Sequence, residues 1–387
     1  MRARLEPWAC ALVAFAALAA GSRFAPSHFN NYSLLADAMT HGRLWIDWPG
    51  PYIDAVAWNG HRYVVNDPLP ALLLLPFALF AHASVNQTLL GCVLAAASAY
   101  AASVLGSRLG APPWARRVLV AFVFFGTDLY WCASFGDVWF VAQVCATFFT
   151  LATLVEIFGR DRPWLVALLW IAACLSRFTL VVATPAVVAL GLWPQGERRP
   201  EAARYVARFA LASVPFVVLY VAYNLARWGV PWDSGHTIFY HQDAQGRPQG
   251  SPFALRNVPY ELYSFVMQAP TFLGAPPWLR PEPTAGVALT WTSPALVYAF
   301  AARRPRRVVV GLWLAALLAA GPSLLYYANG YAQFGMRHAL DFEPFLLASM
   351  LLASRDDFPR YALVLCAISI VAGIWGVWYW RSFVQTF

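Results

Sequence analysis

The chain has 387 residues, of which 60% are apolar and 12% charged, and its mean hydropathy is +0.53. A soluble domain carries about twice that share of charged residues, and a disordered chain has few aromatic residues whereas this one has 16%, so both classes are excluded. All 27 basic residues are arginine, which excludes Schiff-base and P-loop lysine chemistry. The composition predicts a membrane protein with several spans.

Long apolar runs predict the spans in chain order, because about 20 apolar residues cross the hydrocarbon core of a bilayer. Such runs lie at 6–22, 87–106, 116–135, 138–158, 206–226, 286–302, 308–327, 339–354 and 360–380. The run 163–194 is too long for one crossing and has Arg177 near its middle, so we expect two short helices, 163–176 and 178–194. The predicted fold is all-α, a single membrane domain over 1–387 with about 11 transmembrane helices.

Arginine clusters at the ends of these runs predict the orientation, because such clusters stay in the cytoplasm. They include Arg116 with Arg117 and the group at 303–307. We therefore expect a bacterial inner-membrane protein with a cytoplasmic N-terminus and an outside C-terminus. Residues 1–22 are interpreted as an uncleaved anchor in preference to a cleaved signal peptide.

Two large loops, 23–86 and 227–285, then lie on the extracytoplasmic side. In the first loop, 31–41 has the pattern of an amphipathic helix and Gly42 ends it. The run 69–82 contains two prolines and is short, which predicts a juxtamembrane or re-entrant helix rather than a full span. The predicted extracytoplasmic face is the polar one, since all seven histidines and most acidic residues fall on it.

Several charged residues fall at predicted membrane depth, where charge is costly and marks function by default. Arg177 lies between two short helices, and a second group lies in 326–344. In that group helical spacing predicts that Arg337 pairs with Asp341. Asp128 and Asp137 bracket the outer end of a span. Snorkelling, helix capping and structural ion pairs also account for such residues, and that interpretation stays open.

A lipid-linked sugar phosphate suits these features. Arginine presents a planar fork of donors to phosphate, a groove between short helices accepts a lipid tail, and a carboxylate acts as base or orients the acceptor. A divalent cation is compatible with the many carboxylates, but no ligand spacing requires a metal. The six cysteines lie in apolar runs without paired spacing, which predicts buried thiols and neither disulfides nor metal ligands.

Motifs along most of the chain resemble the GT-C superfamily of membrane glycosyltransferases, which contains protein O-mannosyltransferases and lipid A aminoarabinose transferases, and more closely a bacterial branch near them. Tyr32, Met39, Gly42 and Trp45 are similar to the first-loop motif of that family. The segment NDPLPALLLLP at 66–76 resembles its Pro-Pro-Leu segment, and FGMRHALDFEPFLL at 334–347 resembles its late aromatic-Arg-Asp-Pro segment. The resemblance implies a GT-C-like fold with juxtamembrane helices in the first outer loop.

The resemblance also implies roles for individual residues. Arg177 takes the place of a basic residue that contacts the donor phosphate, and Asp137 matches an outer-loop Asp. One departure concerns the base: the family has an acidic pair four and three residues before the Tyr, where this chain has His28 and Phe29. The residues that we expect to act as base in its place are Asp37 by preference, then Asp54 or Asp47 from the same loop, or His28 itself.

The predicted function is the transfer of a sugar from a polyprenyl-phosphate donor to a membrane lipid or cell-envelope glycan, on the extracytoplasmic face and without nucleic acid. We expect Arg177 and Arg337 to hold the donor phosphate. The residues predicted to line the acceptor side of the cavity are Asp128, Asp137, His338 and Asp341. Two alternatives stay open: a non-catalytic GT-C-fold protein that binds a lipid-linked glycan or a partner enzyme, and a lipid or solute transporter.

Overall fold

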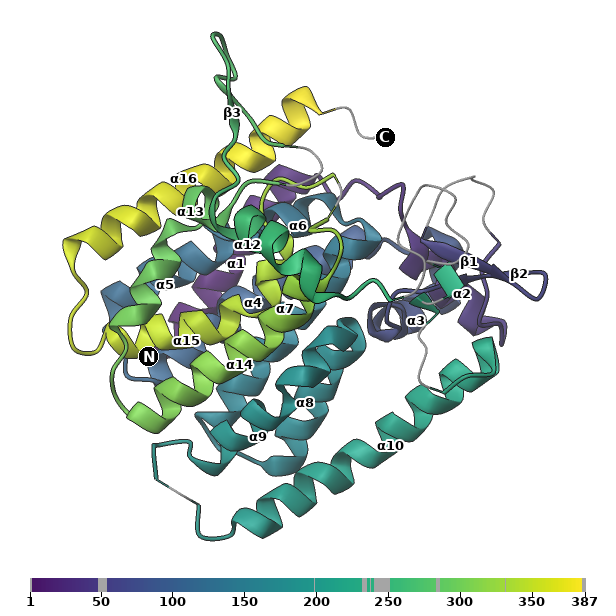
Figure 1. The fold of residues 1–387 in the computed structure, drawn as a ribbon, viewed down its shortest axis with the longest axis horizontal. Helices are drawn as coiled ribbons and strands as arrows, with labels where there is room; N and C mark the ends of the chain where they lie inside the picture. The colour runs from purple at the N-terminus through teal and green to yellow at the C-terminus, as the bar shows by residue number, and fades with distance from the viewer. Residues whose placement is uncertain are drawn as a thin grey trace.

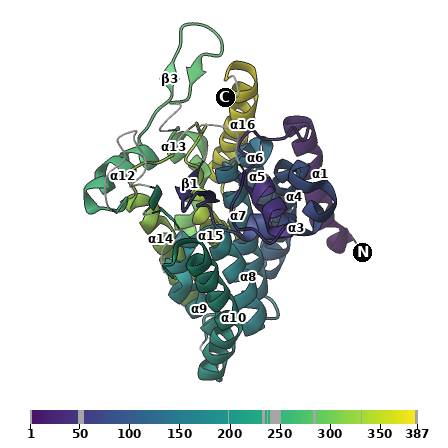
Figure 2. The ribbon, with the colours of Figure 1, turned by 90° about the vertical axis from the view of Figure 1, so that its right-hand side faces the viewer.

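A computed structural model of the protein describes residues 2–47, 54–197, 199–231, 235–236, 238–239, 251–282, 286–330 and 332–384. The described chain is mostly helical (Figures 1 and 2). The predicted second loop, 227–285, falls partly outside the described residues, and residues 48–53 of the first loop fall outside them altogether.

Among the described residues, six helices are long and apolar enough to cross a membrane, or seven if one bent pair counts as a span. The six are α1 (Arg2–Ser22), α4 (Gln87–Arg108), α7 (Val138–Ile157), α10 (Ala202–Trp228), α14 (Arg306–Leu325) and α16 (Arg360–Phe383). A polytopic membrane protein is therefore supported, but the predicted count of about 11 spans is wrong. Because the sides of the loops were deduced from that count, the orientation stays a prediction.

The expected spans at 286–302 and 339–354 are short, broken segments. The first consists of α13 (Leu289–Thr292) and the 3₁₀ helix η4 (Pro294–Ala301). The second consists of the 3₁₀ helix η5 (Arg337–Asp341) and α15 (Glu343–Ala353). Proline lacks an amide N–H and cannot continue a helix, and a proline lies at the start of η4 and of α15. An eleven-residue helix rises only about 16 Å, roughly half the hydrocarbon thickness.

The expected break at Arg177 is confirmed. Helix α8 (Pro163–Ser176) ends there, and the chain continues as the 3₁₀ helix η2 (Phe178–Ala183) and α9 (Thr184–Leu192). Arg177 itself has extended backbone angles, φ −146° and ψ 93°. The break therefore places one arginine between two short apolar helices.

The expected span 116–135 is a bent pair of helices. Helix α5 (Pro113–Phe125) and helix α6 (Leu129–Phe135) meet at an angle of 43°. Gly126 ends α5, and the Thr127 hydroxyl donates a hydrogen bond of 2.7 Å back to the Val123 carbonyl. The bend leaves Asp128 buried within the bundle instead of at an exposed helix end.

The two predicted helices of the first loop are confirmed as α2 (Asn31–Thr40) and α3 (Leu69–Ala81), and α3 is followed by the 3₁₀ helix η1 (His82–Ser84). Tyr32 and Leu35 of α2 are fully buried, as the amphipathic pattern requires. Helix α2 packs against α3 and η1. Helix α12 (Val258–Val266), preceded by the 3₁₀ helix η3 (Leu255–Asn257), lies in the described part of the second loop.

Two short antiparallel hairpins add to a fold that is mostly helical, as predicted. Strands β1 (Ala55–Trp58) and β2 (His61–Val64) pair in the first loop, and β3 (Thr271–Phe272) pairs with β4 (Leu279–Arg280) in the second. The turn between β1 and β2 is Asn59-Gly60, with φ of 47° and 79°, which suits a tight hairpin. Val56 and Tyr63 pack with Trp228, so this hairpin is anchored to the end of α10.

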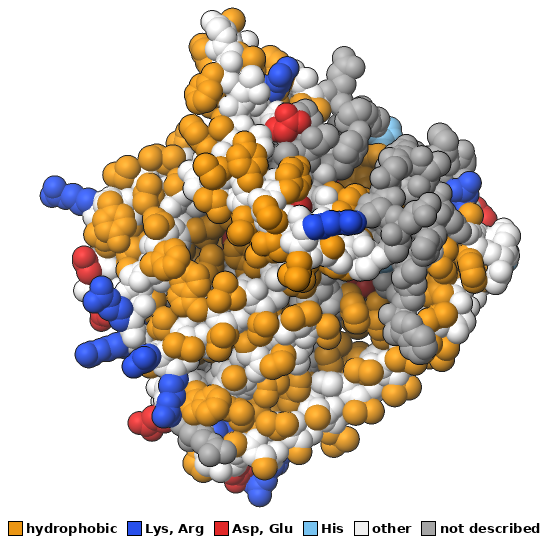
Figure 3. All heavy atoms as spheres, in the orientation of Figure 1, with side chains coloured by type: hydrophobic (Ala, Val, Ile, Leu, Met, Phe, Trp, Pro, Cys, Tyr) orange, Lys and Arg blue, Asp and Glu red, His pale blue; other side chains and the backbone are white. Residues whose placement is uncertain are grey.

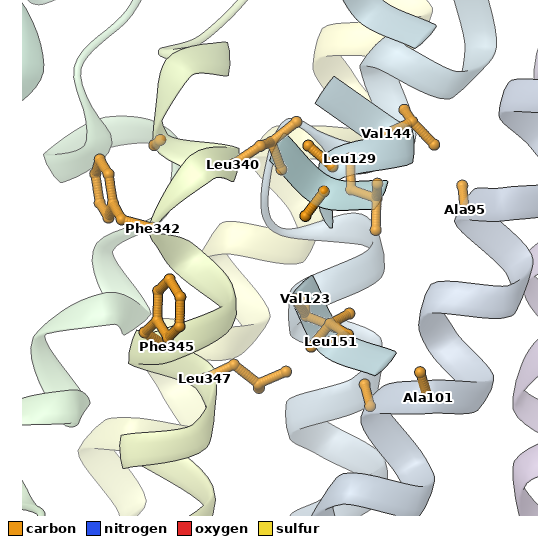
Figure 4. Close-up of a cluster of buried hydrophobic side chains, with 14 of the residues drawn as sticks. Ala95, Ala101, Val123, Leu129, Val144, Leu151, Leu340, Phe342, Phe345 and Leu347 are labelled. Carbon is orange, nitrogen blue, oxygen red and sulfur yellow. The ribbon is translucent and has the colours of Figure 1, made fainter. Parts of the chain in front are cut away.

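The core lies between α4 and α7 on one side and η5 and α15 on the other (Figure 4). Helix α4 is rich in small buried residues, including Gly91, Ala95 and Ala102. Small residues let helix backbones approach closely inside a membrane. In contrast, only 11% of the residues in the most apolar stretch of α10 are buried, and this helix lies at the periphery in Figure 1.

The surface agrees with a membrane location. Apolar side chains cover most of the face in Figure 3, and most of the arginine side chains gather along its lower left edge. The exposed arginines between η4 and α14 and between α15 and α16 include Arg303, Arg304 and Arg355. Basic residues that collect at one end of apolar helices are typical of a membrane protein.

Candidate functional site

Six side chains from four separate parts of the chain make the candidate site. We call this group the arginine cluster: Asp54, Arg177, Tyr326, Arg337, His338 and Asp341. Arg177 comes from the junction of α8 and η2, the last three come from η5, Tyr326 follows α14 and Asp54 precedes β1. Arg337, His338 and Asp341 are buried, and the other three members of the cluster are half-buried.

An ion pair joins two distant parts of the chain in this cluster. The Arg177 guanidinium donates hydrogen bonds of 2.9 and 3.3 Å to the two carboxylate oxygens of Asp341, whose side chain is completely buried. The predicted Arg337–Asp341 pair is therefore wrong. Residues 337–341 form a 3₁₀ helix, in which positions three apart align and positions four apart do not.

Arg337 is nearly buried, yet among the described residues no carboxylate forms a salt bridge with it. Its Nε donates a hydrogen bond of 2.8 Å to the side-chain oxygen of Gln333, and its guanidinium carbon lies 5.4 Å from the Phe140 ring centroid. Arg337 interacts electrostatically with both Arg177 and Asp54. Two positive groups in one buried place favour an anion between or beside them.

Asp54 and His338 complete the cluster. The Trp139 indole donates a hydrogen bond to the Asp54 carboxylate. Tyr326 interacts electrostatically with Asp54 and with both arginines, and its ring centroid lies 6.4 Å from that of His338. The cluster thus contains two guanidinium groups, an imidazole and the Asp54 carboxylate.

Asp67, which sequence reasoning did not select, lies beside the cluster. Its carboxylate accepts hydrogen bonds from the Phe178 amide at 2.7 Å and the Tyr220 hydroxyl at 3.3 Å, and it interacts with Arg177. Burial raises the pKa of Asp67 to about 6, although these partners act to lower it. Asp67 immediately precedes the Pro68 start of α3, and nothing in the sequence indicates that it meets η2.

Two predicted acceptor-side acids lie near Arg337. Asp128 is buried, and neither of its carboxylate oxygens has a hydrogen-bond partner among the described residues. It interacts with Arg337 and with Glu343, another buried acid. Asp137 accepts a hydrogen bond from the Ser27 hydroxyl.

Asp137 also links the predicted base His28 to this region. Burial raises the pKa of Asp137 to about 6, against the effect of Ser27, Arg337 and His28. His28 itself is exposed. The structure therefore brings Asp128, Asp137 and His28 to the surroundings of Arg337.

The contacts of Asp37 and Asp47, the other two predicted catalytic acids, lie elsewhere. Asp47 is exposed and pairs with Arg43 at 2.8 Å. Asp37 faces His41 and His82, 3.8 and 3.5 Å from its Oδ1. Of the first-loop acids in the prediction, Asp54 interacts electrostatically with Arg337 and Tyr326. Asp37, the preferred one, faces His41 and His82 instead.

An apolar groove of about 500 Å³ runs between the β3–β4 region and α16. Its walls include Leu279, Val287, Phe334 and Trp375. The Val287 amide donates a hydrogen bond of 2.9 Å to the Phe334 carbonyl, so one wall belongs to the segment that leads into Arg337. The groove is suited to an apolar chain rather than to a polar ligand.

All six cysteines are free thiols, and five of them are buried, as their apolar surroundings predicted. Comparison with protein-family models, with curated proteins and with solved structures finds no match for this chain. Two neighbouring arginines and a nearby carboxylate suit a phosphate group, and the apolar groove suits a lipid chain.

Proposed function

We propose that this protein is a GT-C-like membrane glycosyltransferase that moves a sugar from a polyprenyl-phosphate donor to a lipid or cell-envelope glycan. In this reaction the acceptor hydroxyl oxygen forms a bond to the anomeric carbon of the sugar, and the bond from that carbon to the phosphate oxygen breaks. The polyprenyl phosphate leaves with the bonding electrons, and the hydroxyl proton passes to a carboxylate. The reaction needs no oxidant, reductant or reactant other than the donor and the acceptor.

The observation that carries the proposal is that half-buried Arg177 and buried Arg337 interact electrostatically with each other. Burying a charge costs several kcal/mol unless a partner compensates it. Asp341 compensates Arg177, whereas Arg337 has a hydrogen bond to a neutral amide and aromatic neighbours. A phosphate diester would supply the missing negative charge and accept the guanidinium hydrogen bonds.

Asp54 is the carboxylate that we assign as base or acceptor orienter. It interacts electrostatically with Arg337, so it lies near the phosphate that Arg337 would hold. Proton transfer requires a base within hydrogen-bond reach of the acceptor hydroxyl. This assignment replaces our preference for Asp37 and leaves the change at His28 and Phe29 without consequence for the reaction.

The apolar groove supports a lipid-linked donor. A polyprenyl chain needs an apolar path beside its phosphate, and the Phe334 wall of the groove leads along the chain to Arg337. We place the reaction on the extracytoplasmic face because the arginine-rich loops between η4 and α14 and between α15 and α16 are expected in the cytoplasm. The proposed location is the bacterial inner membrane.

The test is a transfer assay with purified protein in lipid nanodiscs, a panel of labelled polyprenyl-phosphate sugars and envelope lipids as acceptors. We expect Asp54→Asn to lower the turnover rate by a factor of 100 or more, with donor binding retained, since a general base contributes roughly 10²–10⁴-fold. Asp47→Asn is the matched control, because Asp47 lies in the same loop region but is exposed and pairs with Arg43.

Three results would contradict the proposal or replace it. Donor binding without transfer across the whole panel would favour a non-catalytic binder of lipid-linked glycans. Movement of the donor across proteoliposomes without transfer would favour a flippase. Equal activity of the Asp54→Asn variant and the wild type would remove Asp54 from the reaction.

A further inference from the structure

Three metal-ligating side chains meet at the ends of α2 and α3. Asp37 and His41 lie one turn apart at the C-terminal end of α2, and His82 follows directly after α3. One ligand atom of each residue lies within 4.8 Å of the others, and they are the one such group of three found among the described residues. We call Asp37, His41 and His82 the histidine cluster.

One carboxylate oxygen of this cluster is buried without a hydrogen-bond donor in the described part of the chain. Asp37 Oδ1 is inaccessible to solvent and has no hydrogen-bond donor among the described residues. The Nδ1 atoms of His41 and His82 lie 3.8 and 3.5 Å from it. Leaving a buried acceptor unsatisfied costs roughly 1–3 kcal/mol. A cation between the carboxylate and the two imidazoles would satisfy it.

The two imidazoles are accessible to an ion from solution. The side chains of His41 and His82 are 53% and 68% exposed, and Asp37 is 20% exposed. The rings lie stacked with centroids 6.3 Å apart, so an ion can approach from the open side. A set of two imidazoles and one carboxylate with an open fourth position is typical of Zn²⁺ in proteins.

Small movements bring the donors to coordination distance. Tetrahedral zinc with bonds of about 2.0–2.2 Å holds its donors roughly 3.3–3.5 Å apart. His82 Nδ1 already lies 3.5 Å from Asp37 Oδ1. His41 Nδ1 contacts the Asp37 carbonyl at 2.9 Å and the Thr40 hydroxyl at 3.1 Å, and it exchanges these contacts when it turns toward the ion.

We infer that Asp37, His41 and His82 form a binding site for a divalent transition-metal cation, Zn²⁺ by its donor set, which joins the end of α2 to the end of α3. The site does not share a residue with the arginine cluster. The inference therefore stands or fails independently of the proposed function. The ion's role here is to hold two first-loop helices together.

The test is titration of the purified full-length protein, free of metal, with Co²⁺ followed by competition with Zn²⁺. We expect one equivalent of Co²⁺ to produce the visible absorption of a tetrahedral complex, and Zn²⁺ to displace it. His82→Gln and Asp37→Asn each remove one ligand and should weaken the affinity at least tenfold, since even the loss of a supporting group costs roughly 10–100-fold.

His61→Gln is the matched control. His61 is an exposed histidine of the same loop, and its ring stacks on Trp45 with centroids 4.2 Å apart, outside the histidine cluster. We expect this variant to bind Co²⁺ like the wild type. His82→Gln changes an exposed side chain and so keeps the test valid even if Asp37→Asn fails to fold. Absence of the absorption in the wild type, or equal affinity of wild type and His82→Gln, would overturn the inference.

Discussion

The arginine cluster and the histidine cluster both place charged side chains close together, but they differ in burial. Arg337, His338 and Asp341 are at most 7% exposed, whereas His41 and His82 are more than half exposed. A buried charge is fixed by the cost of desolvation and must be compensated. An exposed group is hydrated and contributes little to stability until a ligand binds. The arginine cluster is therefore preorganised, and the histidine cluster depends on its ion.

The largest expected difference between the two clusters is in stability. Asp341→Ala leaves Arg177 without its carboxylate in the interior and should lower the free energy of unfolding by about 3 kcal/mol or more. Asp37→Ala should lower it by less than about 1 kcal/mol when no metal is present, because its histidine contacts are exposed. Chemical unfolding in detergent with a chelator measures both. An equal loss of unfolding free energy in the two variants would show that burial does not account for a difference in stability between the clusters.

A glycine near each cluster, Gly335 and Gly42, allows a second comparison of stability between the two regions. A Cβ atom at Gly335 would lie 2.5 Å from Asp128 Oδ1, so Gly335→Ala should cost about 2 kcal/mol through overpacking. Gly42 follows His41 and has open space around it but a φ of 69°, so Gly42→Ala should cost only about 1 kcal/mol of backbone strain. Thermal unfolding of the two variants checks this order. A larger loss at Gly42 would contradict it.

The smallest expected effect is a pH dependence at the arginine cluster. Asp67 carries its charge above pH 6 or so, given its pKa of about 6, and that charge competes with an anion for Arg177. Protonation as the pH falls from 7.5 to 5 should therefore strengthen the binding of a phosphate diester about twofold to fivefold. A phosphate diester keeps its charge over this range, so the change comes from the protein.

Asp67→Asn provides the control for that titration. The variant should bind more tightly than the wild type at pH 7.5, and its affinity should change less between pH 7.5 and 5. The change that is left belongs to Asp137, whose pKa is also about 6 and which interacts with Arg337. Cobalt binding at the histidine cluster should be the same in both proteins at any one pH. An equal pH dependence in Asp67→Asn and the wild type would remove Asp67 from the effect.

The break at Arg177 could be predicted from the sequence because a charge in a long apolar run has no place in a single span. The number of spans could not. All eleven residues of α15 are buried, and a helix buried in protein has the same apolar composition as one that faces lipid. Only the length of a helix then shows whether it can span the membrane. Length depends on the helix boundaries, such as those at Pro294 and Gly126, which a sequence predicts least well.

The site was predictable in part. Arg177, Arg337 and His338 were selected because charge is rare at membrane depth. Asp54 and Asp37 lie in one loop, and only the folded chain shows that Asp54 approaches Arg337. The histidine cluster brings Asp37 and His41 of α2 to His82, which lies at the other end of the first loop. No local pattern in the sequence indicates this contact. The Asn59-Gly60 turn, between two stretches rich in β-formers, was a hairpin signal in the sequence that the all-α prediction overlooked.

The central claim is that Arg177 and Arg337 together bind the phosphate of a lipid. The direct measurement compares the affinity of nanodisc-embedded protein for polyprenyl monophosphate with its affinity for the matching polyprenol. We predict that the wild type prefers the phosphate, and that Arg337→Ala lowers phosphate affinity at least tenfold without changing polyprenol affinity. Arg62→Ala, which changes an exposed arginine of β2, should bind like the wild type. Equal affinity of the wild type for the two lipids, or no loss in Arg337→Ala, would contradict the account.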